Sequence, residues 1–256
     1  MFAHAKPARS REGKSGQIFI STEPNWQKYP HISPYAFCLN NPIMFRDADG
    51  NDPDVVLFDV TTQNNDNNNR DKKIIQAGKS IQNLSNTFQV LAHGAFTSEG
   101  SYMRNVVNGN FVAGEAGKIK NADSFDKAFS GCAEWNTGKD KQGFSVILYA
   151  CNTGRGENSL AAKISAKYDK INVIAPTRQL ALTKDKGILG VYGTNKDGTI
   201  NKNDPGYWLV YQKGKVVEAY DATWVPGTST KGHKVDLKAI PKDHYNGATA
   251  NKEFNK

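Results

Sequence analysis

The chain has 256 residues, of which 38% are hydrophobic and 23% charged, a composition typical of a soluble globular protein with one full-sized domain or two small ones. No apolar run is long enough for a transmembrane helix, and the N-terminus lacks the apolar core of a secretory signal peptide. The formal charge of +8 suits a nucleic-acid partner, but the lysines are scattered, with no arginine-rich stripe. We therefore assign the charge mainly to solubility and expect neither a membrane nor a nucleic-acid partner.

The three cysteines are an odd and small number for a chain of this length. They are Cys38, Cys132 and Cys151. A disulfide framework would need an even and larger set, so at least one thiol is expected to stay reduced or to pair with another chain.

Residues 1–50 are proline-rich and irregular, and they predict no helix. The stretch YPHISPYAFCLNNPIMFRDADG (Tyr29 to Gly50) resembles the end of the core of Rhs-repeat proteins, where a P-Y-x-Y-x-x-N-N-P segment runs into a D-P-D-G close. Ala48 stands where the family usually has proline, so the aspartate-dependent self-cleavage found near this close is not carried over. The alternative is a proline-rich arm that lies on the following domain.

The Rhs resemblance implies that residues 1–50 belong to the end of a shell-forming core and that the domain after them is a toxin. It also implies delivery as a secreted effector that acts in a target cell, and a neutralising immunity protein as a partner. The predicted domain plan is this core remnant or arm, a connecting strand and polar loop over residues 51–78, and a toxin domain over residues 79–256.

After the polar patch QNNDNNNR (Gln63 to Arg70), which predicts a mobile loop, strand and helix patterns alternate along the chain. The predicted strands are Val55–Val60, Thr87–Ala92, Phe144–Ala150 and Ile171–Ala175, the predicted helices are Ile74–Leu84, Ser124–Phe129 and Gly156–Tyr168, and a hairpin is predicted over Tyr207–Tyr220. This alternation predicts an α/β fold whose mostly parallel sheet is covered on both faces.

Two of the predicted strands end in residues that carry chemistry. TFQVLA runs into His93-Gly94, and FSVILYA runs into Cys151-Asn152. Because the carboxyl ends of parallel strands share one crevice, the thiol and the imidazole meet there if the two strands are neighbours.

A cysteine beside a histidine is the arrangement that nucleophilic catalysis uses. His93 can take the proton of Cys151 and later return a proton to the leaving amine. Gly94 lets the backbone approach a substrate oxyanion, for which the N–H groups of Gly94 and Cys151 are the expected donors. The positive end of the predicted helix over Gly156–Tyr168 would further favour the thiolate if it points at the sulfur.

LAHG (Leu91 to Gly94) and LYAC (Leu148 to Cys151) together resemble the caspase-like cysteine peptidases, in which one apolar strand ends in His-Gly and a second in Ala-Cys. The stretch Ile147 to Ala161 is also similar to the caspase-related CHAT proteins, and Cys151 follows His93 by 58 residues, close to the roughly 50 of caspases. The resemblance spans Ser80 to Ala175. It implies a three-layer α/β/α sandwich and a His93/Cys151 dyad that needs no cofactor and cleaves a protein substrate.

In the resembling families the chain after the third core strand forms part of the pocket for the residue before the cut. Here that chain is APTRQL, in which Thr177 and Arg178 are the candidate wall residues. Arg178 would face an acidic substrate side chain, whereas Glu99, Asp197 or Asp204 would serve a basic one, and the sequence leaves this choice open.

Other interpretations compete with catalysis. Taken singly, Cys151 would be interpreted as a buried core thiol and His93-Gly94 as a turn at the end of a strand. No cysteine or histidine cluster has zinc spacing, so no metal is predicted. The expected function is a cysteine endopeptidase acting as the C-terminal toxin of an Rhs-type effector, with a basic nuclease-type toxin as the alternative and a non-enzymatic interaction domain as a third possibility.

Overall fold

The computed structural model describes residues 45–46, 54–58, 66–78, 80–107, 110–183 and 187–244. The segment that resembles Rhs proteins, residues 29–50, lies outside these ranges apart from Phe45 and Arg46.

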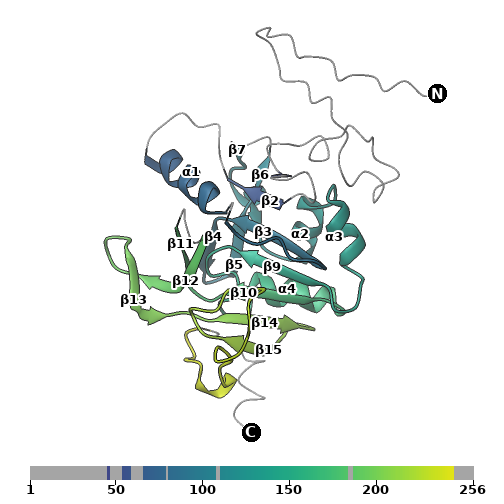
Figure 1. The fold of residues 1–256 in the computed structure, drawn as a ribbon. Helices are drawn as coiled ribbons and strands as arrows, with labels where there is room; N and C mark the ends of the chain where they lie inside the picture. The colour runs from purple at the N-terminus through teal and green to yellow at the C-terminus, as the bar shows by residue number, and fades with distance from the viewer. Residues whose placement is uncertain are drawn as a thin grey trace, which may run out of the picture.

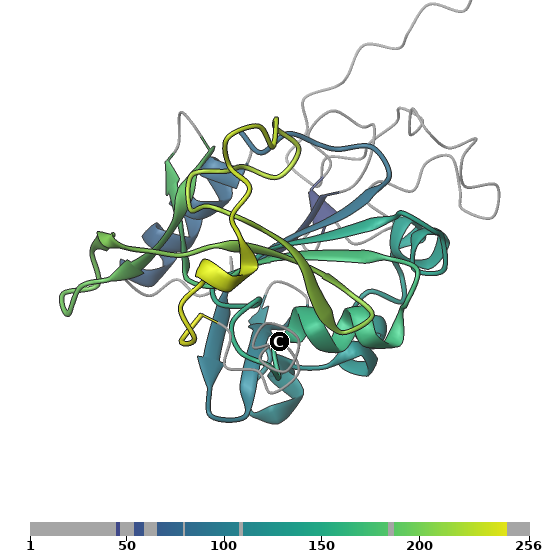
Figure 2. The ribbon, with the colours of Figure 1, turned by 90° about the horizontal axis from the view of Figure 1, so that it is seen from below.

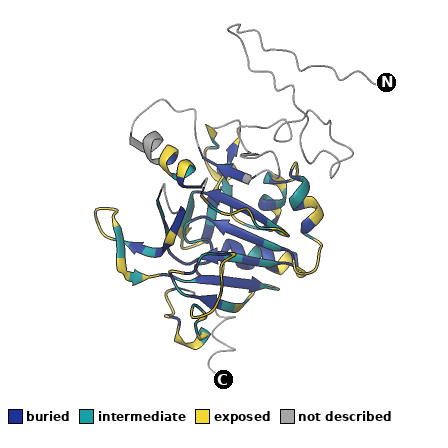
Figure 3. Cartoon of the chain, viewed as in Figure 1, coloured by how far each residue is buried: buried dark blue, intermediate teal, exposed yellow. Residues whose placement is uncertain are grey.

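A seven-stranded sheet forms the centre of the described part of the chain (Figure 1). Its strands, in spatial order, are β1 (Phe45–Arg46), β2 (Asp54–Leu57), β3 (Thr87–Ala92), β9 (Ser145–Tyr149), β10 (Asn172–Pro176), β14 (Trp208–Gln212) and β15 (Lys215–Tyr220). The neighbours β2, β3, β9 and β10 run parallel, whereas β1, β14 and β15 are added antiparallel at the two sides. The inner strands are almost wholly buried (Figure 3), which explains their continuous apolar sequences.

One face of the sheet is covered by α2 (Ala122–Ala128), α3 (Ala133–Gly138) and α4 (Leu160–Lys167) (Figure 2). Aromatic rings fill the space between these helices and the strands, with Phe88 of β3 against Phe125 and Trp135. The opposite face is covered by α1 (Asp66–Gly78) and by a three-stranded antiparallel sheet. The strands of this small sheet are β11 (Gln179–Thr183), β12 (Gly187–Thr194) and β13 (Ile200–Pro205).

Side chains along the inner strands alternate between the two cores. In β3, Val90 and Ala92 face the helical side, while Leu91 faces the side of α1 and the small sheet. In β9, Leu148 faces the helical side and Tyr149 the opposite one. The residues two positions beyond Leu91 and Tyr149 are therefore aligned on the face that carries the small sheet.

The prediction of a mixed α/β fold is confirmed, but the sheet is only partly parallel and the molecule is richer in strands than the sequence pattern indicated. One helix and a small sheet cover the second face, where a helical layer was expected. The segment between β3 and α2 also carries five short strands and a 3-10 turn that the sequence did not indicate. They are β4 (Gly94–Thr97), β5 (Gly100–Arg104), β6 (Val106–Val107), β7 (Asn110–Phe111), the turn Glu115–Gly117 and the further strand β8 (Lys118–Ile119).

Two predicted boundaries are wrong. The asparagine-rich patch was expected to be a loop, yet α1 begins at Asp66 within it and ends at Gly78, well before the predicted helix end at Leu84. The helix α4 begins at Leu160 and not at Gly156, because Gly156 has a positive φ of 83° and the Ser159 side chain caps the helix.

The segment 51–78, expected to connect two domains, supplies an inner strand of the main sheet and one helix of its cover. The predicted hairpin near the end of the chain is confirmed as β14 and β15, with Lys213 and Gly214 both at positive φ in the turn. Within the described ranges, no helix combines the length and the apolar character needed to cross a membrane.

Candidate active site

The ends of β3 and β9 lie side by side. These strands pair in parallel with Leu91 opposite Tyr149, so the same register places His93 opposite Cys151. A Cβ atom on Gly94 would lie 2.1 Å from the carbonyl oxygen of Cys151 and 2.7 Å from its nitrogen. Only glycine permits this close backbone approach, so the fold itself requires Gly94 next to the cysteine.

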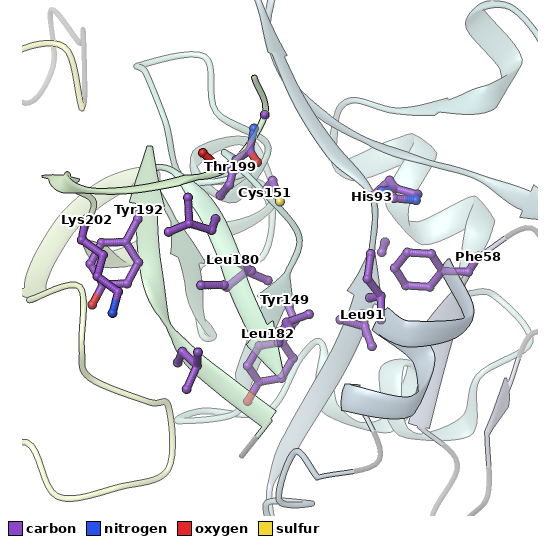
Figure 4. Close-up of a pocket in the computed structure, with 17 residues that line it drawn as sticks. Phe58, Leu91, His93, Tyr149, Cys151, Leu180, Leu182, Tyr192, Thr199 and Lys202 are labelled. Atoms are coloured by element: carbon purple, nitrogen blue, oxygen red, sulfur yellow. The ribbon is translucent and has the colours of Figure 1, made fainter. Parts of the chain in front are cut away.

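His93 and Cys151 both line one cavity of about 580 Å³ (Figure 4). The cavity lies between the main sheet, helix α1 and the small sheet, and the strand β11 forms one of its walls. Both side chains are half-buried, so the imidazole and the thiol are accessible from the cavity while their backbones are fixed by the sheet. Volumes of 300 to 1,000 Å³, roughly, are typical of ligand sites.

Asp71 adds a third group that sequence reasoning missed. Its carboxylate oxygen Oδ1 lies 2.8 Å from Nε2 of His93, and its side chain is only 8% exposed, against 32% for the histidine. Asp71 comes from α1, inside the region expected to be a loop running into a helix, and nothing in the local sequence marks it. With Nε2–H donated to the carboxylate, Nδ1 is the ring nitrogen that can accept a proton from a group in the cavity.

Aromatic rings fix the plane of the imidazole. The ring of Phe58 packs edge-on against His93 with 4.7 Å between the centroids, and Phe111 lies on another side at 5.8 Å. The contacts with Phe58, Phe111 and Asp71 together leave the ring little freedom to rotate.

The loop after Cys151 is held by a dense set of hydrogen bonds. Asn152 has a positive φ of 60°, a conformation that asparagine tolerates better than most residues, and its N–H donates to the carbonyl of Arg178 at 3.0 Å. The N–H of Gly154 donates to the carbonyl of Pro176, and the hydroxyl of Tyr211 donates to the carbonyl of Gly154. A non-glycine residue in this backbone region directly after a candidate nucleophile is typical of functional sites.

The first N–H groups of α4, which would favour the thiolate if they pointed at the sulfur, donate to other groups. The N–H of Leu160 donates to the Ser101 hydroxyl, that of Ala161 to the Thr153 carbonyl, and that of Ala162 to the Ser159 side chain. The first N–H groups of this eight-residue helix therefore hold the loop and its neighbour β5 in place.

The two candidate wall residues, Thr177 and Arg178, do not line this cavity. Thr177 is fully buried, with its hydroxyl 3.0 Å from Nδ1 of His244, and it does not line the cavity. Arg178 is 8% exposed and pairs with Asp204, at 3.2 Å, and with Asp243, because a buried guanidinium needs opposite charges around it. The wall is formed by the residues that follow, from Gln179 to Leu182.

The acidic residues considered for a basic substrate also lie outside the cavity lining. Asp204 is engaged by Arg178, and Asp197 accepts hydrogen bonds from the N–H and hydroxyl of Thr199 within the turn between β12 and β13. Glu99 lies exposed in the turn between β4 and β5.

Cys132 differs sharply from Cys151. It is 2% exposed among the aromatic rings under α3, and burial, together with the nearby Glu134, raises the pKa of its thiol. Cys132 is therefore a protonated core residue. Among the residues described by the structure, no group of histidine, cysteine and carboxylate side chains is arranged to hold a metal ion.

The end of the described chain is attached to the loop after Cys151. The N–H of Gly156 donates to the carbonyl of His244, and the Arg155 guanidinium donates to the carbonyl of Asp243. Burial lowers the pKa of His244 to about 4, and the charge of Arg178 contributes to this shift.

This shift predicts acid sensitivity. Because the pKa of His244 in the folded state lies below the ordinary value of 6.5, the unfolded chain binds the proton first as the pH falls. The contribution of His244 to stability is complete above about pH 6.5 and decreases towards about pH 4. We expect the unfolding midpoint of the wild type to fall more between pH 7 and pH 4.5 than that of His244→Asn, measured by calorimetry. An equal fall of the midpoint in the wild type and in His244→Asn would contradict this prediction. The control is His233→Asn, which replaces a half-buried histidine that is paired with Asp221.

Comparisons with known proteins add little to this geometry. A family model described as "Domain of unknown function (DUF8616)" matches residues 132–201. The matched region contains Cys151 and the strands β11 and β12 but neither His93 nor Asp71. A search of curated proteins and a search of solved structures each gave no match.

Proposed function

We propose that the protein is a cysteine endopeptidase in which Cys151 is the nucleophile, His93 the general acid and base, and Asp71 the residue that positions His93. The observation that carries the proposal is the register of β3 and β9, in which the histidine and the cysteine follow neighbouring parallel strands and open into one cavity. A thiolate beside an imidazole that is itself held by a carboxylate is an established arrangement for acyl transfer.

The reaction starts when His93 takes the proton of the Cys151 thiol. The sulfur attacks the carbonyl carbon of the peptide, a C–S bond forms, and the carbonyl electrons move to the oxygen, which the N–H groups of Gly94 and Cys151 stabilise. When the C–N bond breaks, His93 gives its proton to the leaving amine and a thioester remains. His93 then takes a proton from water, and the resulting hydroxide attacks the thioester carbonyl and forms a C–O bond. The C–S bond breaks, the carboxylic acid leaves, and His93 returns its proton to the sulfur of Cys151.

Two finer parts of the proposal rest on sequence resemblance. The fold is a strand-rich variant of the caspase-like three-layer arrangement, with β11–β13 replacing helical cover on one face. The domain acts as the C-terminal toxin of an Rhs-type effector, with a protein of the target cell as substrate and an immunity protein as partner, as the segment Tyr29 to Gly50 implies. The helical layer that covers the other face of the parallel strands supports the first part.

Labelling by a thiol-directed peptidyl ketone tests the chemistry directly. We expect the adduct on Cys151, located by mass spectrometry, to form at least about 100-fold more slowly in His93→Ala, since a positioned base contributes about that factor or more. His233→Ala, which removes another histidine paired with a carboxylate, should label at the wild-type rate. Equal and slow labelling of every accessible cysteine in all three proteins would reject the proposal and favour the nuclease alternative.

A further inference from the structure

The cavity beside Cys151 has an apolar interior and few charges. Its apolar surface comes from Leu91 and Tyr149 of the main sheet and from Leu180 and Leu182 of β11. In Figure 4, Leu180, Leu182 and Tyr149 lie below Cys151, and Leu91 lies below His93. Leu91 and Tyr149 are 5% and 1% exposed, so they form a fixed floor. Leu189 of β12 also lines the cavity and remains 40% exposed.

The polar groups besides the dyad come mainly from the β12–β13 hairpin, which supplies Tyr192, Thr199 and Lys202. Tyr192 and Lys202 stand together at the wall far from His93, while Thr199 is drawn beside Cys151 (Figure 4). Among the described residues that line the cavity, the ionisable groups besides His93 and Cys151 are Lys202 and the two tyrosines. Arg178 and Asp204, two of the charged residues considered for substrate recognition, pair with each other outside the cavity lining.

From this distribution we infer that the cavity is a specificity pocket for a large apolar side chain, aliphatic or aromatic, next to the bond that is cut. The inference rests on the proposed peptidase function and adds the substrate class. Along the described lining a basic side chain would lose its water, meet no carboxylate and approach Lys202. An acidic side chain would have to pass Leu180 and Leu182 to reach that lysine. An apolar side chain instead covers Leu180, Leu182 and the exposed Leu189, removing apolar surface from water.

A matched set of peptidyl ketones that differ only in the side chain next to the reactive group tests this inference. We expect leucine and phenylalanine probes to modify Cys151 at least about tenfold faster than alanine, aspartate and arginine probes, because apolar pockets discriminate by about that factor or more. Leu180→Glu should slow the leucine probe and speed the arginine probe. The control is Val217→Glu on β15, an exposed position outside the cavity, which should change neither rate.

Failure of this inference is distinguishable from failure of the function. If the aspartate or arginine probe reacts fastest, or all probes react alike, while modification of Cys151 still requires His93, the substrate class is wrong and the peptidase chemistry stands. If no probe modifies Cys151 faster than a free thiol, both are rejected.

Discussion

Replacing Cys151 with alanine is expected to abolish proteolysis and toxicity while leaving the fold intact. The thiol is the only group in the proposed mechanism that forms a covalent bond to the substrate, so nothing else can supply its step. We expect cleavage of a leucine-containing fluorogenic peptide to fall at least about a thousandfold, and growth arrest on expression in bacterial cells to disappear. The small volume change at a half-buried loop position should shift the unfolding midpoint little.

The matched control is Cys132→Ala. This cysteine is buried, so its replacement should lower the unfolding midpoint but leave the kcat of the folded protein near the wild-type value. Retained toxicity in Cys151→Ala, together with degraded DNA or RNA in the intoxicated cells, would overturn the peptidase proposal in favour of the nuclease.

Replacing Asp71 with asparagine is expected to lower kcat about a hundredfold without changing KM. The amide keeps the size of the carboxylate, but it has no charge to stabilise the imidazolium that forms during the reaction. Its NH₂ group can also donate to Nε2 of His93 and so hold the tautomer that carries its proton on Nδ1. Steady-state kinetics on the leucine peptide separate the two constants. Asp71 is 8% exposed and does not line the cavity, so substrate binding should be preserved.

Asp221→Asn provides the comparison for this variant. Asp221 lies 2.9 Å from Nδ1 of His233, a histidine–carboxylate pair at nearly the same distance but outside the cavity, so its replacement should leave kcat unchanged. A merely structural role for Asp71 would instead appear as a lowered unfolding midpoint or a raised KM, with kcat per folded molecule preserved.

The sequence predicted the centre of the sheet well because inner parallel strands are continuous apolar runs. The apolar runs TFQVLA and FSVILYA both predict buried strands. When two such strands are parallel neighbours, His93 and Cys151 follow them at the same edge of the sheet. That His93 and Cys151 follow two core strands was therefore predictable from local pattern, and the pairing of β3 with β9 fulfils the condition under which both reach the same edge.

The surroundings of the dyad were not predictable in the same way. Asp71 lies just after an asparagine-rich stretch, a composition that usually indicates a loop, and its role depends on packing against a residue far along the chain. The position of Arg178 is decided by Asp204 and Asp243, which are distant in sequence. From the local sequence alone, Thr177 and Arg178 after a core strand are equally compatible with a pocket wall. The strands β11–β13, which line the cavity, show no clear alternation of apolar and polar residues that would have predicted them.

The candidate site is assembled from three separate segments: α1 supplies Asp71, the end of β3 supplies His93 and the end of β9 supplies Cys151. No contiguous piece of the unfolded chain holds the three groups together, and the region matched by the family model contains the cysteine alone. The proposed peptidase site therefore exists only once the main sheet has formed and α1 has packed against it. In an unfolded chain the three groups are separate, so folding itself would act as the latency step of the proposed peptidase.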